Sequence, residues 1–412
     1  MRETFEKRSI LFNAKKGENF NHRHTLSISR INPPKFGGGL KFETDAGIGQ
    51  KGAFFKGLRG WHPDAKLSSI ISVKRRKSSM RKSLKHGIAM AAVLILILWG
   101  SVSAATIGQE TSQAMKTLNI SKGSGNLLVL TNAPYVKVNG ACALPYLAQV
   151  QEVTGCSVGK GNLLFFQRSQ SHPLRIMLFK KSTGHAVIIS LKDQKPIIEK
   201  LNLSVRTISE PSFWKTTGSL NASKDMFTLA AIANMWAKGA PYDFLKSAEL
   251  HNHICPGLTS GYLMAHYILD KYPLQNGERY TVVACPVWCK EDALQVVLDC
   301  TPGKKRMVVK PLSKEQQERI SVKNPAGMLL IWDAKNKSGK GVALSFDFDR
   351  LRSLASKDAP KAAVVLAAAD HLDRPDQFVS EAARFELNQG VYEDIVSAGS
   401  NPYAVVGLLR KE

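Results

Sequence analysis

The segment 251–255 (HNHIC) carries the side chains with the clearest capacity for chemistry in this sequence. In an extended segment, alternate residues face the same way, so two imidazoles and one thiol would point to one side. Imidazole nitrogen and thiolate sulfur are the ligands that zinc and related metals prefer. Pro256 then opens a predicted helix, whose N-terminus would lower the pKa of Cys255 and favour its thiolate. The pattern predicts a metal site that includes His251, His253 and Cys255.

A tetrahedral metal ion needs a fourth ligand. Cys285 and Cys289 follow a predicted strand, and Cys289 comes directly before the predicted helix that contains Asp292. We expect Cys289 to be the fourth ligand, with water or a substrate as the alternative occupant. Asp292, Cys285 and His266 are expected around the ligands, in a supporting position.

Other interpretations of these residues stay open. Cys255 could be a nucleophile or a redox thiol that pairs with Cys289 or Cys285, and the whole group could be structural. Cys285 and Cys289 could also form a disulfide in an exported protein. The sequence contains no dinucleotide fingerprint, no c-type haem motif and no iron–sulfur spacing, so we expect no nucleotide, haem or iron–sulfur cofactor.

Several motifs in the second half of the chain resemble one known family. The motif HxHxCPG at 251–257 is followed by Gly261, and CxxDALQ stands at 289–295. CTxGK follows at 300–304, and GKGV at 339–342 fits the end of a hairpin. Both the motifs and their order resemble the FmdE family, whose members are named after formylmethanofuran dehydrogenase.

The resemblance covers about residues 242–350. It implies an α+β core with one bound divalent metal ion, which we expect to be zinc. It also implies His251, His253, Cys255 and Cys289 as the site residues.

An earlier stretch looks like the later part of the same domain. GCSVGKG at 155–161 and DCTPGK at 299–304 each follow an amphipathic helix and come before a hairpin. The first copy lacks the HxHxC segment and has Pro145 where the second has Cys289. We therefore expect a degenerate first half that binds no metal and serves as a structural partner. Chance similarity of two Gly-Lys turns is the alternative.

Helices and hairpins alternate along the chain without regular βαβ units, which predicts an α+β fold. We expect a duplicated FmdE-like core of short strands, hairpins and packed helices, with a helical C-terminal extension. The expected segments are 1–79 (an over-called start or a disordered basic tail), 80–105 (a signal peptide or N-terminal anchor), 106–222 (the degenerate half), 223–350 (the metal-binding domain) and 351–412 (the helical extension).

Residues 80–105 have the order of an export signal: a basic stretch, an apolar run at 88–99 and small residues. The apolar run is shorter than the ~20 residues that span a bilayer. The longer uncharged stretch 87–109 leaves a retained membrane anchor open. Because export signals begin at the N-terminus, we expect Met80 to be the true start, and a basic cytoplasmic tail over 1–79 is the alternative.

The 412 residues carry a formal net charge of +24, from 57 basic and 33 acidic residues. More than half of this excess lies before Thr106, and the rest of the chain has no basic stripe interleaved with aromatic residues. The distribution argues against nucleic-acid binding.

These observations predict an exported periplasmic or extracellular metal-binding protein, acting as a metal carrier or as an accessory to an envelope redox system. Its expected partners are an envelope redox protein or a metal donor or acceptor, and a homodimer stays open. A thiol redox protein and a metal-dependent enzyme of unknown substrate are the alternative functions.

Overall fold

The computed structural model describes residues 107–192 and 195–410. The predicted export signal at 80–105 and the segment before it lie outside the described residues. In the part of the chain that the structure describes, no helix is both long enough and apolar enough to cross a membrane.

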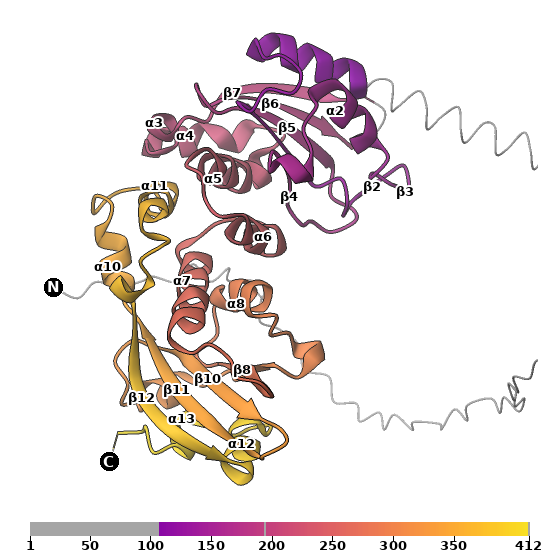
Figure 1. The fold of residues 1–412 in the computed structure, drawn as a ribbon. Coiled ribbons are helices and arrows are strands. Elements are labelled where there is room, and N and C mark those ends of the chain that lie inside the picture. The colour runs from indigo at the N-terminus through magenta and orange to yellow at the C-terminus, as the bar shows by residue number, and fades with distance from the viewer. Residues whose placement is uncertain (1–106, 193–194, 411–412) are drawn as a thin grey trace, which may run out of the picture. The chain divides into compact units, whose positions relative to one another are not determined.

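The first half forms a five-stranded sheet in the order β4-β1-β5-β6-β7 (Figure 1). Its strands are β1 (Leu127–Thr131), β4 (Leu163–Phe165), β5 (Leu174–Lys180), β6 (His185–Leu191) and β7 (Ile197–Asn202). β1 and β4 pair in parallel, and all other neighbours are antiparallel. A separate ribbon joins β2 (Lys137–Val138) to β3 (Ala141–Cys142).

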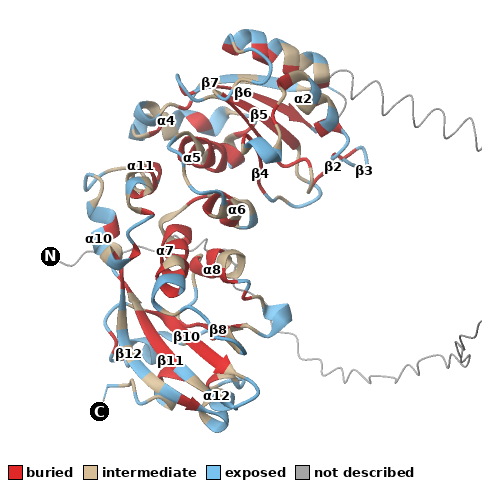
Figure 2. Ribbon diagram, in the orientation of Figure 1, coloured by how far each residue is buried: buried red, intermediate tan, exposed pale blue. Residues whose placement is uncertain are grey.

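The strands β1, β5 and β6 of this sheet are buried on both faces (Figure 2). On one face, Leu127 packs with the helix over 107–118 and with α2 (Tyr146–Thr154). On the other face, Leu128 packs with α5 (Met226–Ala237). Two cores on opposite faces explain why β1 is a continuous apolar run rather than an alternating one.

The second half repeats this arrangement in a sheet of order β12-β11-β10-β8-β9. Its strands are β8 (Glu278–Ala284), β9 (Met307–Val309), β10 (Pro325–Asp333), β11 (Ser338–Phe346) and β12 (Val379–Asn388). β8 and β9 pair in parallel, and the other neighbours are antiparallel. The structure therefore shows the expected α+β fold.

Helices cover both faces of the second sheet as well. α7 (Pro256–Lys271) and α8 (Lys290–Leu298) pack on one face, and α12 (Gln389–Val396) and α13 (Pro402–Val405) pack on the other. The remaining helices are α3 (Val205–Ile208), α4 (Pro211–Thr216), α6 (Tyr242–His251), α9 (Lys314–Glu318), α10 (Phe348–Ser353) and α11 (Lys361–Ala368).

The two sheets share one topology. In each, a helix (α2 or α8) and a short 3-10 turn connect the two parallel strands. Pro145 is the N-cap of α2, and Cys289 is the N-cap of α8. This agrees with the motif alignment that predicts an internal duplication.

The expected helical extension is not wholly helical. It begins with α10 and α11, but residues 379–388 form β12 at the edge of the second sheet. Exposed and partly buried residues alternate along β12, which is the period of a strand. Its alanines and glutamates are residues that favour helices, so the sequence alone indicated a helix. β7 is likewise an edge strand, and all of its residues are exposed or only partly buried.

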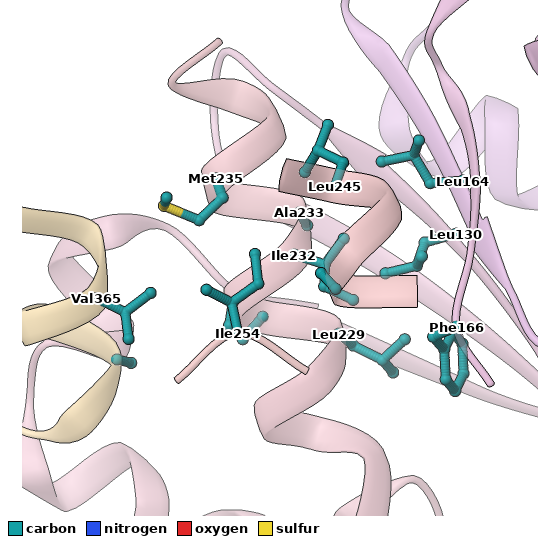
Figure 3. Close-up of a cluster of buried hydrophobic side chains, with 14 of the residues drawn as sticks. Leu130, Leu164, Phe166, Leu229, Ile232, Ala233, Met235, Leu245, Ile254 and Val365 are labelled. Atoms are coloured by element: carbon teal, nitrogen blue, oxygen red, sulfur yellow. The ribbon is translucent and has the colours of Figure 1, made fainter. Parts of the chain in front are cut away.

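One apolar cluster joins the two halves (Figure 3). It contains Leu130 of β1, Leu229 of α5 and Val365 of α11, together with Ile254 from the segment between α6 and α7. Ile254 is fully buried, so it anchors the short segment that carries the predicted ligands. α5, which was expected in the metal-binding domain, packs on the sheet of the first half.

Candidate metal centre

Three of the predicted ligands meet at the ends of three helices. His251 is the last residue of α6, Cys255 is the N-cap of α7 and Cys289 is the N-cap of α8. One ligand atom from each lies within 4.8 Å of the others, and His251 Nε2 is 3.6 Å from Cys255 Sγ. Atoms that bind one zinc ion at about 2.0–2.3 Å can be no more than about 4.6 Å apart. The group therefore fits a single metal ion with little rearrangement.

The alternation of side chains predicted for 251–255 requires an extended segment. The structure shows a turn there instead. Asn252 has a left-handed conformation (φ 64°) and caps the C-terminus of α6, a position that asparagine tolerates. Because this turn breaks the alternation, His253 does not join the group of three. Its ring lies 4.3 Å from that of His251 and 5.7 Å from that of Phe227, measured between centroids. Burial lowers the pKa of His253, which keeps its imidazole neutral.

Asp292 occupies the expected supporting position. Its Oδ2 lies 2.7 Å from His251 Nδ1. A carboxylate on one imidazole nitrogen fixes the tautomer and leaves the other nitrogen free to bind a metal. Here the free atom is Nε2, which is the atom that faces Cys255.

The three ligand side chains have shifted pKa values, and the shifts differ in direction. Burial lowers the pKa of His251, but hydrogen bonds to Asp292 and Cys289 outweigh it and raise the pKa to about 9. The hydrogen bond from Cys289 lowers the pKa of Cys255 to about 7, and the Leu258 N–H, which donates to Cys255 Sγ at 3.3 Å, adds to this. The same bond between the thiols raises the pKa of Cys289 to about 12. Without metal, the two sulfurs therefore share one proton beside an imidazolium.

Two glycines of α7 allow α8 to begin close to the ligands. A Cβ on Gly261 would lie 2.2 Å from the Lys290 carbonyl oxygen, and one on Gly257 would lie 2.9 Å from Cys289 Cβ. Trp288 Nε1 also donates to Ser260 Oγ of α7, at 3.0 Å. The glycines of the motif therefore have a packing role: they bring Cys289 up to Cys255.

Two other predicted residues have different surroundings. Cys285 is fully buried in the core on the far face of the second sheet, where burial raises its pKa to about 12. His266 Nε2 is 3.1 Å from Asp243 Oδ2, a carboxylate that also accepts from Tyr262 at 3.1 Å through its other oxygen. Neither side chain belongs to the group of three.

Sequence reasoning missed three cations near the centre. Lys361, the first residue of α11, is close enough for its charge to lower the pKa of Cys255, and Arg168 of the first half acts in the same way on His253. The side chain of Lys290 is buried, and its Nζ pairs with Glu291. Arg168 and Lys361 lie far from the motif in the sequence, and Lys290 fills one of its variable positions, so no local signal marks them.

Residues 250–383 match the model of a protein family described as FmdE, Molybdenum formylmethanofuran dehydrogenase operon. The matched range contains the three grouped ligands and Asp292, and it runs into β12. The resemblance expected from the motifs is therefore confirmed for the C-terminal part. No curated protein matches the chain.

Proposed function

We propose that this FmdE-like domain binds one divalent metal ion, zinc, through His251 Nε2, Cys255 Sγ and Cys289 Sγ. The observation that carries the proposal is the convergence of these three ligand atoms within 4.8 Å, with Asp292 on the far nitrogen of the imidazole. A neutral imidazole and two thiolates balance the charge of Zn²⁺, and their softness suits zinc better than magnesium or calcium.

Three protein ligands leave one position of a tetrahedral ion for another molecule. Structural zinc sites are closed by four protein ligands, whereas sites that exchange or activate a ligand keep a position open. When bound, zinc would supply a Lewis acid at that position. The residues of this chain hold the metal, and Asp292 orients His251.

We propose further that the protein acts outside the cytoplasm, as a metal carrier or as an accessory to an envelope redox system. Support comes from the export-like sequence at 80–105 and from the family description, which refers to a dehydrogenase operon. The N-terminal mass of the native protein tests the export step. A mature chain that begins near residue 105 supports export by a cleaved signal, a chain that begins at Met80 leaves the retained anchor, and a chain that retains residues 1–79 contradicts the start at Met80.

Metal content tests the binding proposal. The protein, reconstituted with zinc and freed of excess metal, should hold one ion per chain. Cys255→Ser and Cys289→Ser should each remove most of it, because each deletes a thiolate ligand. Cys142→Ser is the matched control, since Cys142 is an exposed free thiol outside the group. A wild-type protein that holds no metal would refute the proposal.

A thiol redox function is the second candidate, favoured by the hydrogen bond between Cys255 and Cys289 and by the low pKa of Cys255. These two thiols would form the pair, because Cys285 is buried in a separate core. Thiol counts separate the functions. A redox protein would lose two thiols reversibly under mild oxidation and would hold no stoichiometric metal.

A further inference from the structure

A buried cluster of charges lies in the first half of the chain. The carboxylate of Asp225 is fully buried and accepts from Arg168 Nε at 2.7 Å and from Arg175 Nε at 3.1 Å. His172 Nε2 lies 2.9 Å from the same carboxylate. One negative charge therefore faces two guanidinium groups and an imidazole, so the cluster carries at least one unbalanced positive charge.

The guanidinium groups keep donors without strong partners. Arg175 is 3% exposed, and its Nη1 has no hydrogen-bond partner among the described residues. Arg168 Nη1 reaches only the neighbouring Gln167 carbonyl, at 3.4 Å. The Nη2 atoms are paired, that of Arg168 with Thr228 Oγ1 at 3.0 Å and that of Arg175 with the Asn221 carbonyl at 2.7 Å. Burying a charge without compensation is costly, and the unpaired buried Nη1 of Arg175 indicates an unseen partner. An anion is the partner that would complete this cluster.

Two contacts bring the segments that carry the cluster next to the segment that carries His251 and Cys255. The Gln167 N–H, next to Arg168, donates to the Glu249 carbonyl at 3.1 Å, two residues before His251. Phe227, two residues after Asp225, has its ring 5.7 Å from that of His253.

We propose that Arg168, His172 and Arg175 bind the anionic group of the molecule that takes the fourth position on the metal. The ligand class is a small molecule with an oxyanion, carboxylate or phosphate, because guanidinium groups match the geometry of both. Asp225 is a positioning residue that orients the two arginines. Arg168 and His172 are partly exposed, at 14% and 20% of their side chains, and Arg175 is more deeply buried. The inference rests on the metal site proposed above.

Calorimetric titration of the zinc-loaded protein with inorganic phosphate, and separately with acetate, tests the inference. At least one of these probes should bind, and Arg168→Gln should weaken its binding about tenfold or more, because a charge-assisted hydrogen bond is lost. His172→Gln should weaken binding as well, and removing the zinc should weaken it in the wild type. Arg206→Gln, at an exposed arginine of α3, is the matched control and should leave binding unchanged.

The outcomes separate the two proposals. A protein that binds zinc but neither probe, or that binds them equally well in Arg168→Gln, overturns the anion site and leaves the metal site standing. If the probe binds equally well with and without zinc, the inference that one molecule contacts both the arginines and the metal is overturned. A wild type that binds no zinc overturns the proposed function itself. If Arg168→Gln fails to fold, as shown by circular dichroism, His172→Gln decides the result in the same way.

Discussion

At the scale of single residues, the centre depends on how His251 is held. Its Nδ1 contacts Asp292 and its Nε2 faces Cys255, so Asp292 orients the ring and Nε2 can bind a metal once it has lost its proton. The two thiols and this imidazole hold protons that a metal must displace. Both features have measurable consequences.

Asp292→Asn should weaken zinc binding about 10–100-fold, because the amide orients the imidazole less well and does not raise its basicity. Competition with a chromophoric chelator measures this. Asp299→Asn is the matched control, since Asp299 caps the other end of α8 and is exposed. Equal zinc affinity in Asp292→Asn and the control would show that the carboxylate does not support the ligand.

Zinc affinity should rise with pH between 7 and 9. In this range His251 (pKa about 9) is mostly protonated, Cys289 (pKa about 12) is a thiol and Cys255 (pKa about 7) is mostly a thiolate. Binding then releases about two protons, and a higher pH favours it. Above pH 9 the release should fall to about one proton. Calorimetry in two buffers of different ionisation enthalpy measures the release, and a pH-independent affinity would contradict these proton positions.

Residue type and spacing were enough to predict most of this centre. His251, Cys255, Cys289 and Asp292 come together as expected. His253 was harder to place, because the left-handed turn at Asn252 depends on how α6 ends and not on the motif alone. The sequence could not predict that cations such as Arg168 lie near the ligands, since only the tertiary fold brings them there.

At the scale of elements, the packing of α7 against α8 sets the position of Cys289. The two glycines of α7 leave no room for a side chain between the helices. The metal centre therefore depends on backbone contacts that include no ligand atom.

Gly261→Ala should destabilise the protein by about 1–3 kcal/mol and weaken zinc binding, because the new Cβ would lie 2.2 Å from the Lys290 carbonyl oxygen and would push α8 away. Urea unfolding and metal content measure the two effects. Gly303→Ala is the control, since no atom lies within 4 Å of a Cβ at that position. Normal zinc binding in Gly261→Ala would show that the contact between α7 and α8 does not set the position of the ligands.

Elements were predictable where apolar periodicity was strong. The helices α2, α7 and α8 and the strand β8 were expected from the sequence. The edge strands β7 and β12 were not, because an edge strand with one exposed face lacks a continuous apolar run.

At the scale of the whole molecule, the two halves share a core, although each has its own sheet. α5 packs on β1 of the first sheet, while Ile254 ties the same cluster to the segment that carries His251 and Cys255. The equal strand order of the two sheets agrees with the prediction that the first half is a degenerate copy of the second.

Residues 223–412 expressed alone should therefore fold poorly, although the sequence indicated a domain boundary near 222. The fragment would expose the face of α5 that carries Leu229 and Ile232, both buried in the full chain. We expect a broad thermal transition for the fragment and a sharp one for residues 106–412, measured by circular dichroism. A sharp transition in both would show that the second half is an independent domain.

The most direct test of the central claim is the X-ray absorption fine structure of the zinc-loaded protein. We expect a zinc shell with two sulfur ligands at about 2.3 Å and one imidazole nitrogen at about 2.0 Å, completed by one light atom. Cys289→Ser should reduce the sulfur count to one in whatever zinc remains. A shell of nitrogen and oxygen alone, or one with four sulfurs, would contradict the site formed by His251, Cys255 and Cys289.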